Sequence, residues 1–159
     1  MTLICPTDLV DAPIGVVWGL LAAPAEWGDF FDLRVRDVDP PGPAHVGQRL
    51  RAESGPAFLH LKVSVEFTQI DATDHRLGAK VVLPLGVVVS EDMHLAPVGA
   101  DRCRVTYGCD FSFPAGLRGW IVEALLQREV RVGPAQSLAR LKAAAEQAHR
   151  LALTPELKA

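Results

Sequence analysis

A carboxylate interrupts an apolar strand face in the second half of the chain. Residues 87–95 alternate in polarity, and Glu91 shares one face with Val87, Val89, Met93 and Leu95. If that face points inward, burial raises the pKa of Glu91 and makes the residue a candidate general acid or base. A slip or bulge of one residue would instead turn Glu91 to solvent, because it reverses every side chain of a strand. The sequence leaves both orientations open.

A tyrosine on the last predicted strand could complete an acid–base pair. On residues 102–113, the face that carries Tyr107 otherwise holds only apolar residues and cysteines. A buried phenol usually finds a polar partner, which here could be Glu91, a ligand oxygen, the backbone or water. Cys109 shares this face and is treated as lining, because no histidine is placed by the sequence to activate its thiol. The candidate catalytic residues are Glu91 and Tyr107.

Other residues are predicted to line the same interior. Aromatic residues at the first short helices often shape the mouth of a pocket, although ordinary core packing explains them too. On the last helix, Trp120 and Gln127 are two turns apart and can face one cavity together. The predicted ligand-binding residues are Trp27, Phe30, Phe67, Val89, Met93, Cys109, Phe111, Trp120, Ala124 and Gln127.

The N-terminal third predicts one strand and two short helices that would hold the aromatic residues. An apolar strand is expected over residues 3–10. Asp11 and Pro13 then mark a helix start, since Pro13 needs no backbone donor in the first turn. Apolar residues at helical spacing continue this helix to Leu21, and a second short helix is expected over residues 25–31.

The remainder of the chain predicts a sheet followed by one long helix. Strands are expected over residues 33–38, 47–53, 59–70, 76–83, 87–95 and 102–113. After Pro114 a period of 3.6 holds to about His149, with a kink expected at Pro134. The order has no βαβ alternation, so the fold class is α+β. We expect a curved antiparallel sheet of about six to seven strands wrapped on the long C-terminal helix, with a cavity between them.

Composition indicates one domain and excludes several kinds of partner. The 159 residues suit a single domain, expected over residues 1–150, with a frayed tail at 151–159. The net charge of −3, from 16 basic and 19 acidic residues, offers no basic stripe for nucleic acid. The longest apolar stretch, residues 81–89, is too short to span a bilayer, so no integral membrane contact is expected. A homodimer is left open.

Cysteine use and the first residues bear on location and on metal binding. The N-terminus lacks the basic start and apolar stretch of a signal peptide, and three cysteines agree with a reducing compartment. We therefore expect a cytoplasmic protein. No Cys/His spacing matches a zinc site, and no phosphate loop is present, so neither a metal nor a cofactor is expected.

Three fragments in order resemble a known family. They are Val10-Asp-Ala-Pro-Ile-Gly-Val-Val-Trp18 with Trp27 nine residues on, Met93-His-Leu-Ala-Pro97 followed by Arg102–Thr106, and Leu138–Glu146. They resemble the polyketide cyclase/dehydrase-like group of the START-related, birch-allergen-like (SRPBCC) superfamily. The resemblance implies a helix-grip fold with a ligand cavity. It transfers no catalytic motif, because the superfamily includes lipid carriers, natural-product binders, aromatase/cyclases and stress-response proteins.

Two classes of function therefore remain, and a third is weaker. The protein could bind a small hydrophobic molecule such as a lipid or polyketide in its cavity. It could instead be a cyclase- or dehydratase-like enzyme that uses Glu91 and Tyr107 for acid/base chemistry. Action through a protein partner would have only the outer sheet face to use. The sequence favours binding, because it predicts a cavity and contains no motif for a reaction.

Overall fold

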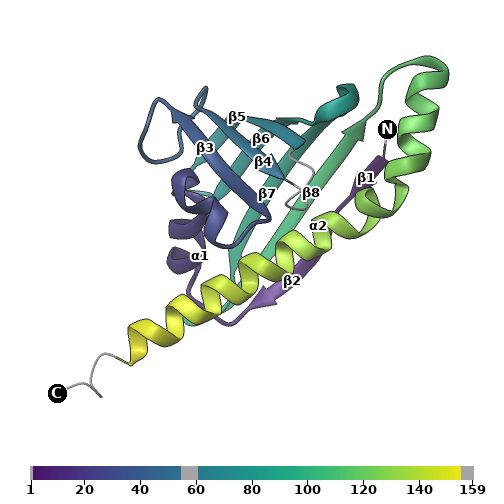
Figure 1. Ribbon diagram of the computed structural model, residues 1–159. Helices are drawn as coiled ribbons and strands as arrows, with labels where there is room; N and C mark the ends of the chain where they lie inside the picture. Colours follow the sequence, from purple (N-terminus) through teal and green to yellow (C-terminus); the bar gives the residue numbers. More distant parts are fainter. Residues whose placement is uncertain (1, 55–60, 155–159) are drawn as a thin grey trace.

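An antiparallel sheet forms the body of the protein (Figure 1). The structure is a computed structural model that describes residues 2–54 and 61–154. Within these residues the sheet has eight strands: β1 Thr2–Ile4, β2 Thr7–Val10, β3 Leu33–Asp39, β4 Arg49–Ser54, β5 Leu61–Asp71, β6 Arg76–Val82, β7 Val88–Pro97 and β8 Cys103–Ser112. Their order is β1-β8-β7-β6-β5-β4-β3, and β2 also pairs with β8. The fold class predicted from the sequence, α+β, is confirmed.

Pro6 divides the first predicted strand into two. β1 and β2 both run antiparallel to β8, with Ile4 opposite Cys109 and Thr7 opposite Thr106. Pro6 has no N–H to continue the ladder, but its carbonyl accepts a hydrogen bond from the backbone N–H of Tyr107 at 2.9 Å. The sheet therefore has one strand more than the seven that the sequence indicates at most.

Two short helices follow β2 and close one end of the sheet (Figure 1). α1 spans Ile14–Leu21, and η1, a 3₁₀ helix, spans Pro24–Asp29, two residues short of the predicted end. The indole N–H of Trp27 donates to the Leu21 carbonyl at 3.2 Å, which ties the two helices together. The Trp27 ring then meets Phe31 and Phe67 edge-on, each at a centroid distance of 5.4 Å. A third short helix, η2 Pro84–Gly86, joins β6 to β7.

The long C-terminal helix, α2, spans Gly116–Leu153 and contains Pro134. Figure 1 shows it as two arms that meet at a bend: the first runs beside β1, and the second crosses in front of the sheet next to β2. Over residues 130–145 the helix buries a continuous stripe: Val130, Pro134, Leu138, Leu141 and Ala145. Helix extends to Leu153, into the predicted tail, and residues 155–159 lie outside the described part. The predicted start of β5 at residues 59–60 also lies outside it.

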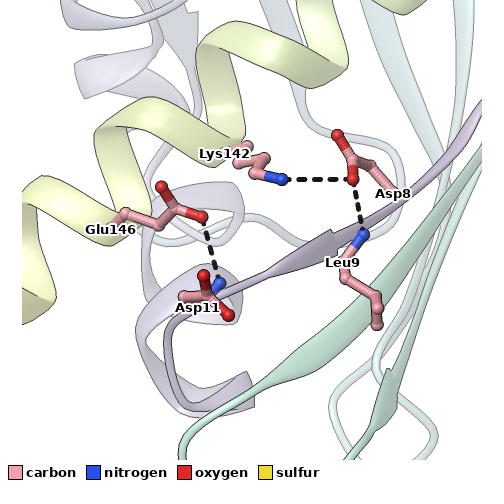
Figure 2. Close-up of polar contacts among 5 residues, drawn as sticks. All are labelled: Asp8, Leu9, Asp11, Lys142 and Glu146. Atoms are coloured by element: carbon pink, nitrogen blue, oxygen red, sulfur yellow. Dashed lines mark hydrogen bonds and ion pairs between the residues drawn. The ribbon is translucent and has the colours of Figure 1, made fainter.

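Polar contacts fix the second arm against β2 and the turn after it (Figure 2). The Lys142 ammonium donates to the Asp8 carboxylate at 3.1 Å. One turn further along, the Glu146 carboxylate accepts from the backbone N–H of Asp11, also at 3.1 Å. Leu141 and Ala145, each the residue just before one of these two, are fully buried. The side chains that this arm turns toward the sheet therefore have defined positions. Among the described residues, no helix combines the length and the apolar character needed to cross a membrane.

Candidate functional site

A pocket of about 250 Å³ lies between the sheet and the second arm of α2. Its sheet wall is mostly apolar, from β5, β6 and β7, and includes Val63, Val65, Val81 and Met93. Trp27 and Phe31 line it from the short-helix side, and Gly133 from α2. The polar groups of the sheet wall are few, and two of them are Glu91 and Tyr107.

The register of β7 decides which way Glu91 points. Glu91 pairs with Ala79 on β6 and with Cys109 on β8, and neither ladder contains a bulge along β7. The two residues beside it on the same face, Val89 and Met93, are buried. Because the strand is regular, its alternation places Glu91 on that inner face, where it lines the pocket. The side chain is half-buried, because protein encloses it except where it faces the pocket.

Glu91 and Tyr107 lie together inside this pocket and act on each other's pKa. Tyr107 lies opposite Met93, so it is the diagonal neighbour of Glu91 across β7 and β8, within reach of a long side chain. The phenol O–H lies close enough to the Glu91 carboxylate to act on its pKa as a hydrogen-bond donor. Burial raises the pKa of Glu91 to about 7, and the hydrogen bond from Tyr107 opposes that rise. Near neutral pH the protonated and ionised forms of the carboxyl group are therefore both populated.

The two neighbouring titratable groups keep their protons. Burial, and then the charge of Glu91, raise the pKa of Tyr107 well above its usual value, so the phenol acts as a hydrogen-bond donor. Burial also raises the pKa of the Cys109 thiol, again with a contribution from Glu91. A thiol with a raised pKa is a poor nucleophile. The geometry thus supports proton transfer at Glu91 and offers no thiolate.

Predicted ligand-binding residues fall into three groups in the structure. Trp27 and Met93 line the pocket together with the Glu91–Tyr107 pair. A second group belongs to the buried core and does not line it: Phe30, Phe67, Val89, Cys109 and Phe111. Phe67 still acts on the pocket, because it packs edge-on against the Trp27 ring that forms part of the wall.

The third group lies away from Glu91, in a separate hollow of about 440 Å³. Trp120, Ala124 and Gln127 line it together with Thr2 of β1, and the Trp120 side chain is 67% exposed. The helical spacing brings these three residues to one side, as the sequence indicates. However, none of the three lines the pocket that contains Glu91, and Figure 1 shows the first arm of α2 running beside β1 at the edge of the sheet.

The rim of the pocket contains residues that the sequence analysis did not select. Arg140 of α2 approaches Asp32, just after η1, with Nη1 and Oδ2 separated by 3.6 Å. Both side chains are substantially exposed, which places this ion pair at the outer edge. Glu129, Gln136 and Ser137 of α2 also line the pocket. The sequence pattern that could have identified them is their helical spacing, because residues 129, 133, 136, 137 and 140 share one helix face.

The described residues offer no evident metal site. Residues 2–54 and 61–154 contain no group of three or more His, Cys, Asp or Glu side chains placed to hold a metal ion.

Comparison with known proteins supplies the family. Residues 7–146 match the family described as polyketide cyclase/dehydrase and lipid transport. The chain belongs to this family. Its members form part of the SRPBCC superfamily, as the sequence resemblance indicates. By sequence, no curated protein matches the chain.

Solved structures of this superfamily share the fold. The Zhui aromatase/cyclase from Streptomyces sp. R1128 superposes with a TM-score of 0.73 at 19% identity, over 95% of this chain and 97% of that one. Norcoclaurine synthase from Thalictrum flavum, in complex with dopamine and hydroxybenzaldehyde, gives 0.67 at 19% identity, over 99% and 89%. TTHA0849 from Thermus thermophilus gives 0.66 at 14% identity, over 92% and 99%. The polyketide cyclase-like chain thus has a helix-grip fold, with its sheet and long helix arranged as in these proteins.

Proposed function

We propose that this protein binds a small, mostly apolar organic molecule in the pocket between the sheet and the second arm of α2. The observation that carries the proposal is the Glu91–Tyr107 pair inside an otherwise largely apolar sheet wall. Apolar pockets with a few placed polar groups are typical of small-molecule sites, because the wall supplies affinity and the polar groups fix orientation. Membership of a family of cyclases, dehydrases and lipid transporters supports the same class of function.

The volume of the pocket limits the size of the ligand. An apolar cavity of ~150 Å³ accommodates benzene. A pocket of about 250 Å³ therefore suits a compound of one or two rings better than a lipid. Burying ~300 Å² of apolar ligand surface gains about 7 kcal/mol, whereas association costs roughly 4–15 kcal/mol. Tight binding thus depends on the contacts that Glu91 and Tyr107 make.

Acid/base catalysis of a cyclase or dehydratase type is the second candidate function. The observation that favours it is the pKa of Glu91, which burial raises to about 7. A general acid or base works best when its pKa lies near the working pH. In such a reaction Glu91 would take a proton from the bound molecule, while Tyr107 would donate a hydrogen bond to a ligand oxygen or to the carboxylate. A carrier needs neither group in ionisable form.

Native mass spectrometry of the purified protein, compared with its denatured mass, tests the binding function. A co-purified small molecule is the expected result, and the native mass also tests the homodimer left open by the sequence. Gly133→Leu should abolish the bound mass, because Gly133 lines the pocket and a Cβ there meets no atom within 4 Å. Gly19→Leu on α1 is the matched control, since its Cβ is equally free and lies outside the pocket.

Each outcome of that experiment has a definite meaning. Loss of the bound mass in Gly133→Leu but not in Gly19→Leu supports the pocket as the site. Equal occupancy in both variants would mean that the ligand binds outside this pocket, and it would refute the proposal. Turnover by the wild type that Glu91→Gln abolishes, with binding retained, would favour catalysis over carriage. Cys5, Cys103 and Cys109 are free thiols, which supports the proposal of a reducing compartment such as the cytoplasm. The assays should therefore be run under reducing conditions.

A further inference from the structure

The charges that line the pocket are unbalanced. Four charged side chains do so among the described residues: the carboxylates of Asp32, Glu91 and Glu129, and the guanidinium of Arg140. Arg140 is already engaged at the rim, where Nη1 lies 3.6 Å from Asp32 Oδ2. The lining therefore has an excess of negative charge, and low-dielectric walls focus such a field into the pocket.

Glu91 has no cationic partner in the described part of the chain. No lysine, arginine or histidine of these residues forms an ion pair with it. The side chain that acts on its pKa as a hydrogen-bond donor is the Tyr107 phenol. An ionised carboxylate offers about four acceptor positions on two oxygens, so one phenol leaves most of them unused. These positions are on the side chain that faces the pocket.

A bound molecule must supply the positive charge and the hydrogen-bond donors that the described residues do not place at Glu91. An anionic ligand would add a like charge beside Glu91, and the only lining cation of the described residues is half-exposed and paired with Asp32. A neutral ligand would displace water from the carboxylate without compensating its charge. An ammonium group would donate hydrogen bonds and neutralise the charge at once. Trp27 and Phe31 add aromatic faces to the same wall, which attract cations as well as rings.

We propose that the pocket selects an organic cation: a primary or secondary amine carried on an apolar body of one or two rings, with its ammonium group at Glu91. This inference rests on the proposed function and names the ligand class for that site. It assigns Glu91 the role of counter-ion and Tyr107 the role of orienting donor. It also assigns the rim carboxylates Asp32 and Glu129 a supporting role, because they make the entrance attractive to a cation.

The proposal implies a pH dependence that an uncharged ligand would not show. Only ionised Glu91 pairs with an ammonium group, so amine affinity should rise as pH increases from 6 to 8. The titratable groups beside Glu91 on β8, Tyr107 and Cys109, stay protonated over this range, because burial raises the pKa of each. From α2 and the segment after η1, the rim contributes Glu129 and the Asp32–Arg140 ion pair, all near the surface.

Three probes with one ring system test the ligand class: 1-naphthylmethylamine, 1-naphthalenemethanol and 1-naphthoate. Their dissociation constants are measured by fluorescence titration at pH 6 and pH 8. At pH 8 the amine should bind at least about tenfold more tightly than the alcohol, and the carboxylate should bind most weakly. In Glu91→Gln the preference for the amine should disappear while alcohol binding remains. Glu26→Gln, which removes an exposed carboxylate of η1, should keep the preference.

The outcomes separate this inference from the proposed function. If the alcohol binds as tightly as the amine, and Gly133→Leu abolishes both, the pocket binds ligands but does not select cations. A preference for the amine that survives Glu91→Gln would also overturn the inference. If none of the probes binds, or binding is insensitive to Gly133→Leu, the proposed site itself fails. Thermal unfolding of each variant, measured alongside, distinguishes lost binding from lost folding.

Discussion

Replacing Glu91 by glutamine should stabilise the protein, and increasingly so at higher pH. Burial raises the pKa of Glu91 from 4.5 to about 7 in the folded protein. A raised carboxyl pKa means that the fold prefers the protonated group over the ionised one. Below pH 4.5 both folded and unfolded states are protonated, so the preference costs nothing. As pH rises from 4.5 towards 7, the unfolded state ionises while the folded state holds its proton, so stability falls; above 7 both states are ionised and the loss levels off.

The size of this effect follows from the pKa values. A rise from 4.5 to about 7, at 1.36 kcal/mol for each pKa unit, corresponds to about 3 kcal/mol at full ionisation. Linkage gives about 3 kcal/mol at pH 8, about 2 kcal/mol at pH 6, and almost nothing at pH 4. These are upper values, because water in the pocket solvates part of the charge. Glutamine keeps the shape of the side chain and cannot ionise, so Glu91→Gln should recover the pH-dependent part.

Urea unfolding at pH 4, 6 and 8 measures this prediction. The quantity to plot is the difference in free energy of unfolding between Glu91→Gln and wild type against pH. It contains a constant from the altered hydrogen bond with Tyr107, and the predicted rise with pH is added to that constant. Glu26→Gln, an exposed carboxylate on η1, should give a nearly flat line. A flat line for Glu91→Gln as well would refute the burial of its charge and remove the basis of the second candidate function.

Three further substitutions test the surroundings of the pocket. Tyr107→Phe removes the interaction that lowers the pKa of Glu91, so the pH at which the stability loss levels off should move above 7. An unchanged end of the loss would mean that the pair is not formed. Leu141→Ala should lower the free energy of unfolding by about 2–5 kcal/mol in urea, because Leu141 lies on the buried side of α2 and is fully buried. Lys142→Met should cost at most about 1 kcal/mol in the same assay, since its ion pair with Asp8 is partly exposed, and a larger loss would contradict that assignment.

The sheet and its inner face could be read from the sequence because their physical signal is local. Alternation in residues 87–95 and 102–113 reflects one buried and one exposed face, and β7 and β8 keep that alternation without a bulge. Glu91 and Tyr107 could therefore be placed together. The sequence could not establish the orientation of Glu91, because a one-residue slip leaves the composition unchanged and reverses the face.

The walls that come from other elements were harder to predict, because they depend on tertiary geometry. Helical spacing gathers Trp120 and Gln127 on one side, but periodicity does not say where a helix bends or which arm covers the sheet. The same limit applies to Arg140 and Asp32, which are far apart in the chain and meet only across the pocket rim. Pro6 shows the same limit. It lies in the strand predicted from the sequence, but only the pairing of β1 and β2 with β8 shows that the strand divides there.

A carboxylate that destabilises the empty pocket links ligand binding to stability. Glu91 costs up to about 3 kcal/mol when ionised. A ligand whose free concentration is 100 times its dissociation constant stabilises the folded state by about 2.7 kcal/mol. Binding of an amine at that concentration would therefore offset most of the destabilisation by ionised Glu91. We therefore expect saturating 1-naphthylmethylamine to raise the melting temperature of wild type more at pH 8 than at pH 6. In Glu91→Gln this pH dependence should vanish, because the variant has neither the buried charge nor the counter-ion. Equal shifts at both pH values in wild type would show that the ligand does not use the carboxylate, whatever its affinity.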